Sequence, residues 1–148
     1  MNKRYALALM GAVLCVGPAR AALADEGVPT PTVSPCDDFA PRFQEVYLYV
    51  DWNFTGTCWK LRANGEPFSR IRNVAEYGIW NDSITSVRVG PNVRLRMYKD
   101  WYWQGSGPYI ITGNTWPNGF TVDDANLGAS PGITNFNDAM TSLSLETW

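Results

Sequence analysis

The hexapeptide NDSITS, residues 81–86, returns fifty-six positions later as NDAMTS, residues 137–142. Each copy reads Asn-Asp, two variable positions and Thr-Ser, and each leads into alternating residues, VRV in the first case and LSL in the second. A block that is repeated with its flanking pattern indicates two copies of one supersecondary unit, stacked so that they bury a common core. This repeat limits the fold more than any other feature of the chain.

A second spacing repeats in the same order. Tyr49 is followed seven positions later by Gly56, and Tyr98 is followed seven positions later by Gly105. Around these markers lie short runs of strand composition, several of them alternating apolar with polar residues, at 46–50, 57–61, 83–89, 93–98 and 140–145. A turn at 74–77 is the only helical feature expected. The sequence therefore predicts an all-β domain, residues 46–148, in which two Greek-key motifs (46–90 and 91–148) form a two-sheet sandwich.

The first 24 residues have the composition of a secretory signal peptide. Lys3 and Arg4 precede a short apolar run at 5–17, and Ala22-Leu23-Ala24 supplies small residues for cleavage. The run is too short to predict a membrane span. Removal of this segment would leave 124 residues with 9 basic and 14 acidic side chains, a net charge of −5. We therefore expect a secreted, extracellular or periplasmic protein, and the charge disfavours nucleic acid as a partner.

Two cysteines, Cys36 and Cys58, remain after cleavage. In an exported chain they are expected to form one disulfide. It would tie an N-terminal linker segment, residues 25–45, to the first hairpin, and a loop of this length stabilises a fold by roughly 3 kcal/mol.

The chain has no histidine. Ser-His-Asp and Cys-His catalysis and histidine-based zinc sites are therefore excluded. Two adjacent acidic pairs, Asp37-Asp38 and Asp123-Asp124, occur in loop-like sequence, where such side chains usually face water rather than a substrate. We expect no enzymatic activity.

An aromatic residue, six positions and a glycine, followed by an Asn/Asp-Asn/Asp-x-x-Ser/Thr-Ser block, resembles the pattern of the βγ-crystallin family. The stretch YGIWNDSITSVRVGPNVRLRMYKD, residues 77–100, is especially similar to microbial calcium-binding members such as the spore-coat Protein S. The resemblance covers about residues 45–147. It implies a non-enzymatic protein in which two Ca²⁺ ions lie between the motifs and stabilise the domain.

The same resemblance implies a set of oxygen ligands, because Ca²⁺ takes six to eight oxygens. Each motif contributes to both sites. The implied ligands are the carboxylates of Asp82 and Asp138, the hydroxyls of Thr85 and Thr141, the carbonyls of Ser83, Ala139, Asp51 and Asp100, and in part the side chains of Asn81 and Asn137. Taken alone, either hexapeptide is also ordinary turn chemistry, with side chains bonded to nearby backbone.

Two other functions stay open. Some small exported proteinase inhibitors with a disulfide look crystallin-like, and the segment 123–137 or the Cys36–Cys58 region could supply a rigid inhibitory loop. Alternatively, Trp101, Tyr102 and Trp116 could present aromatic faces to a carbohydrate, the cell envelope or a partner protein. The hairpin aromatics Tyr49, Phe54, Tyr98 and Trp103 are expected to pack as core instead.

Overall fold

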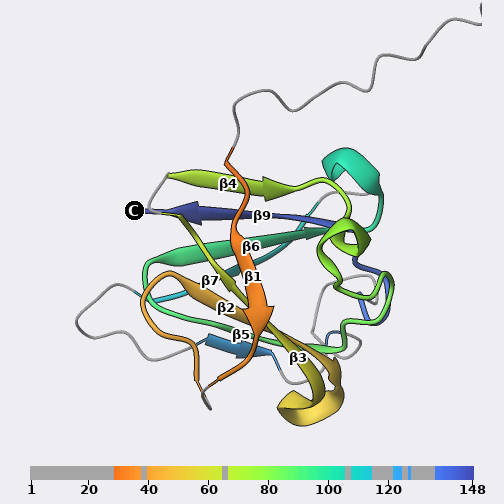
Figure 1. Ribbon diagram of the computed structural model, residues 1–148, viewed down its shortest axis with the longest axis horizontal. Coiled ribbons are helices and arrows are strands. Elements are labelled where there is room, and N and C mark those ends of the chain that lie inside the picture. Colours follow the sequence, from red (N-terminus) through yellow and green to blue (C-terminus); the bar gives the residue numbers. More distant parts are fainter. Residues whose placement is uncertain are drawn as a thin grey trace, which may run out of the picture.

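The computed structural model describes residues 29–37, 40–64, 67–105, 108–114, 122–124, 127 and 136–148. In these ranges the protein is a two-layer β-sandwich with no α-helix (Figure 1). The predicted signal peptide, Trp116 and most of the 123–137 segment lie outside the described residues. What the sequence predicts for those residues therefore stays a prediction.

Nine strands and three short 3₁₀ turns make up the described fold. The strands are β1 (Thr32–Pro35), β2 (Glu45–Asp51), β3 (Thr55–Arg62), β4 (Phe68–Ile71), β5 (Ser86–Val89), β6 (Val93–Tyr98), β7 (Tyr109–Thr112), β8 (Val122–Asp124) and β9 (Ser142–Thr147). The turns are η1 (Trp52–Phe54), η2 (Val74–Tyr77) and η3 (Trp101–Trp103). All five predicted strand runs overlap observed strands, and η2 lies at the expected turn.

The two motifs exchange one strand each. One sheet has the order β1-β3-β2-β5-β8 and the other has the order β4-β9-β6-β7. Motif one contributes β2, β3 and β5 to the first sheet but places β4 beside β9 in the second, and motif two places β8 beside β5 in the first. This reciprocal exchange makes each sheet depend on both halves of the chain. The predicted two-sheet, double Greek-key fold is confirmed.

The core lies between the sheets. Alternate side chains of β2, β5, β6 and β9 face inward, as the period-two pattern predicted. Among the largest fully buried side chains are Leu48, Leu95 and Leu143. Since both motifs contribute to one continuous cluster, neither has a core of its own.

The repeated tyrosine-to-glycine spacing forms a folded hairpin in each motif. In the first, Tyr49 is buried and its ring packs edge-on against Phe54, with centroids 5.7 Å apart. Gly56 has a φ of 75°, and a Cβ there would collide with the carboxylate of Asp51, so the turn requires glycine. Both hairpin tips lie at the same end of the sandwich, opposite the C-terminus (Figure 1). That end also holds the two Asn-Asp blocks.

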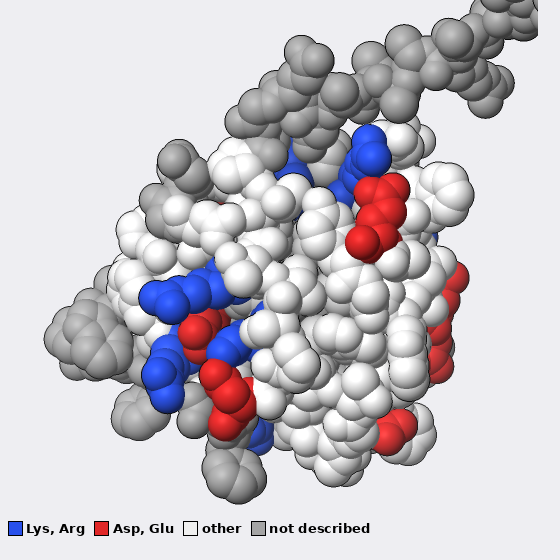
Figure 2. All heavy atoms as spheres, viewed as in Figure 1, with Lys and Arg blue, Asp and Glu red and all other residues white. Residues whose placement is uncertain are grey.

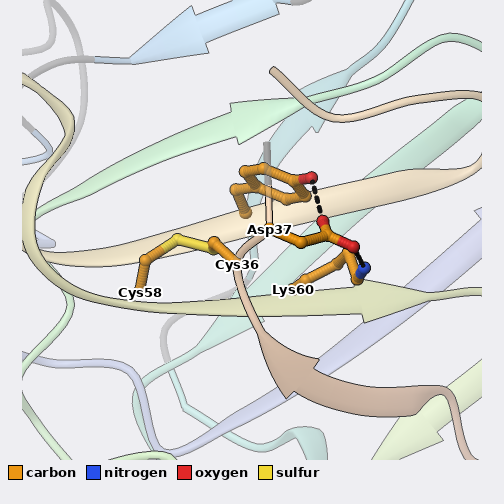
Figure 3. The surroundings of a disulfide bond; sticks show 5 residues. Cys36, Asp37, Cys58 and Lys60 are labelled. Carbon is orange, nitrogen blue, oxygen red and sulfur yellow. Dashed lines mark hydrogen bonds and ion pairs between the residues drawn. A yellow bond between two sulfur atoms is a disulfide. The ribbon is translucent and has the colours of Figure 1, made fainter. Parts of the chain in front are cut away.

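The N-terminal segment 25–45, predicted as a linker, contains a strand. β1 pairs with β3, and Cys36 and Cys58 form the predicted disulfide directly beyond that pairing. Figure 3 shows Asp37 next to the disulfide, with its carboxylate turned toward Lys60. The hydrogen bond from Lys60 holds the pKa of Asp37 below its ordinary value. The disulfide and this ion pair together fasten β1 to the edge of the first sheet.

The acidic pair Asp123-Asp124 lies in a strand rather than in a loop, and Asp38 of the other pair lies outside the described residues. Asp123 and Asp124 lie in β8, where Asp123 forms an ion pair with Arg88 at 3.4 Å and Asp124 accepts a hydrogen bond from Tyr109. On the face shown in Figure 2, basic and acidic atoms adjoin one another and uncharged surface separates the groups. Within the described part of the chain, no helix is long and apolar enough to cross a membrane.

Candidate metal centre

Both Asn-Asp blocks form the same turn. Asp82 has a φ of 51° and Asp138 a φ of 50°, a left-handed conformation that Asp and Asn tolerate better than other side chains. In each turn the preceding asparagine donates a hydrogen bond to the aspartate Oδ2, over 3.0 Å from Asn81 and 2.7 Å from Asn137. The two asparagines therefore orient carboxylates.

Each turn pairs with the other across the molecule. The Thr85 hydroxyl donates to Asp138 Oδ1 at 3.1 Å, and the Thr141 hydroxyl donates to Asp82 Oδ1 at 3.2 Å. The backbone repeats this exchange, since Asp82 N–H donates to the carbonyl of Met140 and Asp138 N–H to the carbonyl of Ile84. Thr85 and Thr141 are buried, whereas both aspartates are exposed. The result is two carboxylate–hydroxyl pairs, each built from both motifs.

The carbonyls of Asp51 and Asp100 lie beside the buried serines that follow each threonine. Ser86 Oγ donates to the carbonyl of Asp51 and Ser142 Oγ donates to that of Asp100, both over 2.6 Å. The same two hydroxyls accept hydrogen bonds from the backbone of the hairpin tips, at 3.1 Å in each motif. A carbonyl oxygen has two lone pairs, so each of these carbonyls retains capacity for a second partner. The serines fix where those carbonyls lie relative to the threonines.

An open pocket of about 640 Å³ lies at the first of these sites. Its lining includes six residues predicted as ligands: Asp51, Asp82, Ser83, Thr85, Asn137 and Asp138. Sequence reasoning missed Val50, Trp52 and Thr55, which also line it. Their signal was available in principle, because all three belong to the hairpin whose tip the repeated glycine marks.

Comparisons with known proteins agree with the fold. No family model matches the sequence. Spherulin-3A from Physarum polycephalum is 28% identical over 108 residues, which cover 73% of this chain and 87% of spherulin-3A. A solved structure concerned with the evolution of the eye-lens βγ-crystallin domain fold matches with a TM-score of 0.63 and 25% identity, over 79% of this chain and 99% of its own. The chain is thus similar in sequence to spherulin-3A and has the βγ-crystallin fold.

The N-terminal domain of Protein S has the same fold. Its TM-score is 0.52 at 18% identity, and the match covers 70% of this chain and 96% of that domain. At such identity the likeness concerns the fold alone. The two-sheet fold is therefore a feature that this chain shares with its structural neighbours.

The donor set suits a hard cation. Every predicted ligand atom is an oxygen, and Ca²⁺ binds carboxylate, carbonyl and hydroxyl oxygens at about 2.3 to 2.6 Å. Oxygens that share one such ion lie roughly 3 Å apart, and the carboxylate–hydroxyl pairs are 3.1 and 3.2 Å apart. Among the described residues no group of three or more Asp, Glu, Cys or His side chains forms a cluster. A metal here would depend on hydroxyls and carbonyls as much as on carboxylates.

The aromatic residues proposed as a partner surface are partly described. Trp101 and Tyr102 are 56% and 41% exposed, and both belong to η3. The Arg72 guanidinium lies 5.9 Å from the centre of the Tyr102 ring, which holds that side chain against motif one. Trp52, the counterpart of Trp101 in the first hairpin, is 57% exposed. Each hairpin tip of the protein therefore presents a tryptophan next in sequence to a predicted carbonyl ligand.

Proposed function

We propose that this protein is a secreted, non-enzymatic βγ-crystallin that binds two Ca²⁺ ions between its Greek-key motifs and is stabilised by them. The observation that carries the proposal is the crosswise pairing of Thr85 with Asp138 and of Thr141 with Asp82. Two turns that served only their own strands would have no need to exchange side-chain bonds across the molecule. The pairing instead brings donor oxygens from both motifs to two points.

Each ion would be held by one residue set. The first comprises the Asp138 carboxylate, the Thr85 hydroxyl and the carbonyls of Ser83 and Asp51. The second comprises the Asp82 carboxylate, the Thr141 hydroxyl and the carbonyls of Ala139 and Asp100. Each bound ion supplies positive charge that offsets the carboxylates and links the two motifs. With one carboxylate in each set, we expect affinities in the micromolar to millimolar range of extracellular modules.

Stabilisation follows from mass action. An ion that binds the folded state alone adds about 2.7 kcal/mol to the free energy of unfolding when its concentration is a hundred times Kd. Because each set spans both motifs, the ions oppose separation of the halves as well as local fraying. Export into a calcium-rich medium, as the N-terminal residues predict, would keep such sites filled.

Calorimetric titration of the calcium-stripped mature protein tests the proposal. We expect two binding events in the wild type, one in Asp82→Ala, one in Asp138→Ala and none in the double variant, with a higher Tm wherever calcium binds. Glu76→Ala is the matched control, because Glu76 is an exposed carboxylate on η2 that pairs with Arg72. Absence of heat and of any Tm shift at millimolar calcium in the folded wild type would refute it.

A further inference from the structure

The pocket beside the first predicted ion set combines polar groups with one exposed aromatic face. Carboxylates, an amide and hydroxyls line it, and Trp52 forms part of its wall. Saccharides match this mixture, because one face of a sugar ring exposes apolar C–H groups and its edge carries hydroxyls. Ligand sites of this kind fix orientation with a few polar groups and gain contact area from aromatic rings.

Trp52 is held in place by the hairpin but is not needed for the hairpin's packing. The Thr55 hydroxyl donates to the Trp52 carbonyl at 2.8 Å, and Ser86 anchors the next turn of backbone through Phe54 N–H. The aromatic packing within this hairpin is carried by Tyr49 and Phe54. A large apolar side chain that is 57% exposed on a fixed backbone is suited to contact with a ligand.

The first ion set leaves room for ligand oxygens. Four protein oxygens are assigned to it, and Ca²⁺ takes six to eight, so at least two positions remain for water or for another donor. A vicinal pair of sugar hydroxyls supplies two neighbouring oxygens. Because the pocket is open to solvent and both Asp138 and Trp52 line it, a ligand at such an ion could also contact Trp52.

Charge selects among ligands that carry vicinal oxygens. The pocket is lined by Asp51, Asp82 and Asp138 and by no basic side chain among the residues described there. After loss of the N-terminal 24 residues the protein as a whole has a net charge of −5. The bound ion offsets part of the negative charge of the pocket. The overall charge of the protein still disfavours acidic polysaccharides and anionic lipid surfaces, whereas a neutral saccharide is not repelled by it.

We propose that the pocket formed by η1 and the two Asn-Asp turns binds a neutral saccharide, with two vicinal hydroxyls at the ion held by Asp138 and Thr85 and an apolar ring face on Trp52. The inference rests on the proposed calcium binding at the same site. It assigns the ligand role to Trp52 of the first hairpin rather than to the Trp-Tyr-Trp sequence of the second.

Affinity electrophoresis in native gels tests the proposal with three neutral polymers: mannan, galactomannan and xyloglucan. Their terminal residues present axial–equatorial and diequatorial vicinal diols. We expect the wild type to be retarded by at least one polymer in calcium and to migrate freely in EDTA. The same polymer, after periodate cleavage of its vicinal diols, should no longer retard the protein.

Two tryptophan variants distinguish binding in the pocket from nonspecific binding of the polymer to exposed tryptophan. Trp52→Ala should weaken binding of the retained polymer at least tenfold while keeping both calcium events in calorimetry. Trp101→Ala is the matched control, because Trp101 has the same place in the second hairpin and nearly the same exposure but is not among the residues lining this pocket. It should bind the polymer as the wild type does. Asp138→Ala should lose both the polymer and one calcium event.

The outcomes distinguish this proposal from the one on which it rests. If no calcium event is measured, calcium binding itself fails. If both calcium events are present but none of the three polymers retards the protein, the saccharide site is refuted. Retention that persists in EDTA, or equal loss in Trp52→Ala and Trp101→Ala, also overturns it. So would calcium-dependent binding to phosphatidylserine vesicles in preference to all three polymers.

Discussion

The two Greek-key motifs share a backbone scaffold and differ in the side chains around it. Thr85 and Thr141 make matching bonds, and so do the serines that follow them, with distances that agree within 0.1 Å. Around this scaffold, Val50 of motif one is replaced by Lys99 in motif two, and Ser83 by Ala139. The hydrogen bonds that place the candidate ligands are thus duplicated, whereas the electrostatics of the two sites are not.

The arginine residues that stack on the hairpin aromatics also differ between the two motifs. In motif one the Arg88 guanidinium lies 4.0 Å from the centre of the Phe54 ring. The corresponding residue of motif two is Ser144, and the guanidinium over Trp103 comes from Arg70, at 4.7 Å. Arg70 is directly opposite Ser144 in the β4–β9 pair. One motif therefore supplies this contact from its own strand, and the other takes it from the strand that it receives by exchange.

The largest effect should come from breaking the shared scaffold. Ser86→Ala and Ser142→Ala each remove the partner of a carbonyl, that of Asp51 or Asp100, and of a hairpin N–H, which should cost about 2 kcal/mol. Because the bonds are matched, the two losses should agree within about 0.5 kcal/mol. Urea unfolding in EDTA, where calcium cannot contribute, measures both.

Ser144→Ala is the control for that pair. Ser144 lies two residues beyond Ser142 on β9, is equally buried, and its hydroxyl has no hydrogen-bond partner. Removal of this hydroxyl should change the free energy of unfolding by less than about 0.5 kcal/mol. If Ser86→Ala or Ser142→Ala were as mild as this control, the scaffold would not depend on the serine bridges.

A smaller effect should separate the two ion sites. Lys99 adjoins Asp100, whose carbonyl is assigned to the second ion, whereas the corresponding Val50 is uncharged. A like charge near a solvent-exposed cation site costs about 1 kcal/mol or less at low salt. Lys99→Val should therefore tighten calcium binding at the second site by up to about fivefold, and Val50→Lys should weaken the first by a similar factor. Calorimetry on each variant in an Asp82→Ala or Asp138→Ala background resolves the site concerned.

Salt provides the internal control for this pair. Both changes in affinity should shrink when the ionic strength is raised, because screening shortens the range of the interaction. Equal calcium affinity in Lys99→Val and the wild type at low salt would show that the Lys99 charge does not affect ion binding. Any difference in calcium affinity between the two proposed sites would then have to come from Ser83 and Ala139.

Much of this architecture can be predicted from the repeats, because they encode local geometry. The glycine that closes each hairpin, the Asn-Asp turn and the alternating strands all depend on residues within a few positions of one another. The exchange of β4 and β8 is different. FSRI and VDD are too short to show a clear period, and their pairing partners, β9 and β5, lie far away in the sequence.

The candidate site likewise has residues that local sequence predicts and residues that it does not. Asp82 and Asp138 are recognisable because the hexapeptide is repeated, and the resemblance to the βγ-crystallin family supplies the expectation that each motif serves both sites. Nothing in the sequence favours Trp52 over Trp101 as a ligand contact. Only the folded hairpin shows that Trp52 lines the pocket beside Asp138. Which aromatic residue faces a pocket depends on packing between distant segments, and no local pattern records it.

The smallest effect concerns a charge that only motif two carries. Glu146 receives hydrogen bonds from Arg96 at 3.0 Å and Arg94 at 2.9 Å, whereas motif one has Gly90, Tyr47 and Glu45 at the matching positions. The two arginines, Arg96 foremost, hold the pKa of Glu146 below its ordinary value of 4.5. A carboxyl whose pKa is lower in the folded state stabilises the fold above its unfolded pKa. That contribution disappears as the pH falls through the folded value.

Glu146→Gln should therefore lower the free energy of unfolding by about 0.5 kcal/mol at pH 7, a modest value because the side chains are about one-third exposed. The difference from the wild type should shrink as the pH falls below 4.5. Urea titrations in calcium-free buffer at several pH values measure this convergence. A difference that stayed constant to pH 3 would mean that the substitution acts through packing rather than charge, and the electrostatic contrast between the motifs would then be limited to the ion sites.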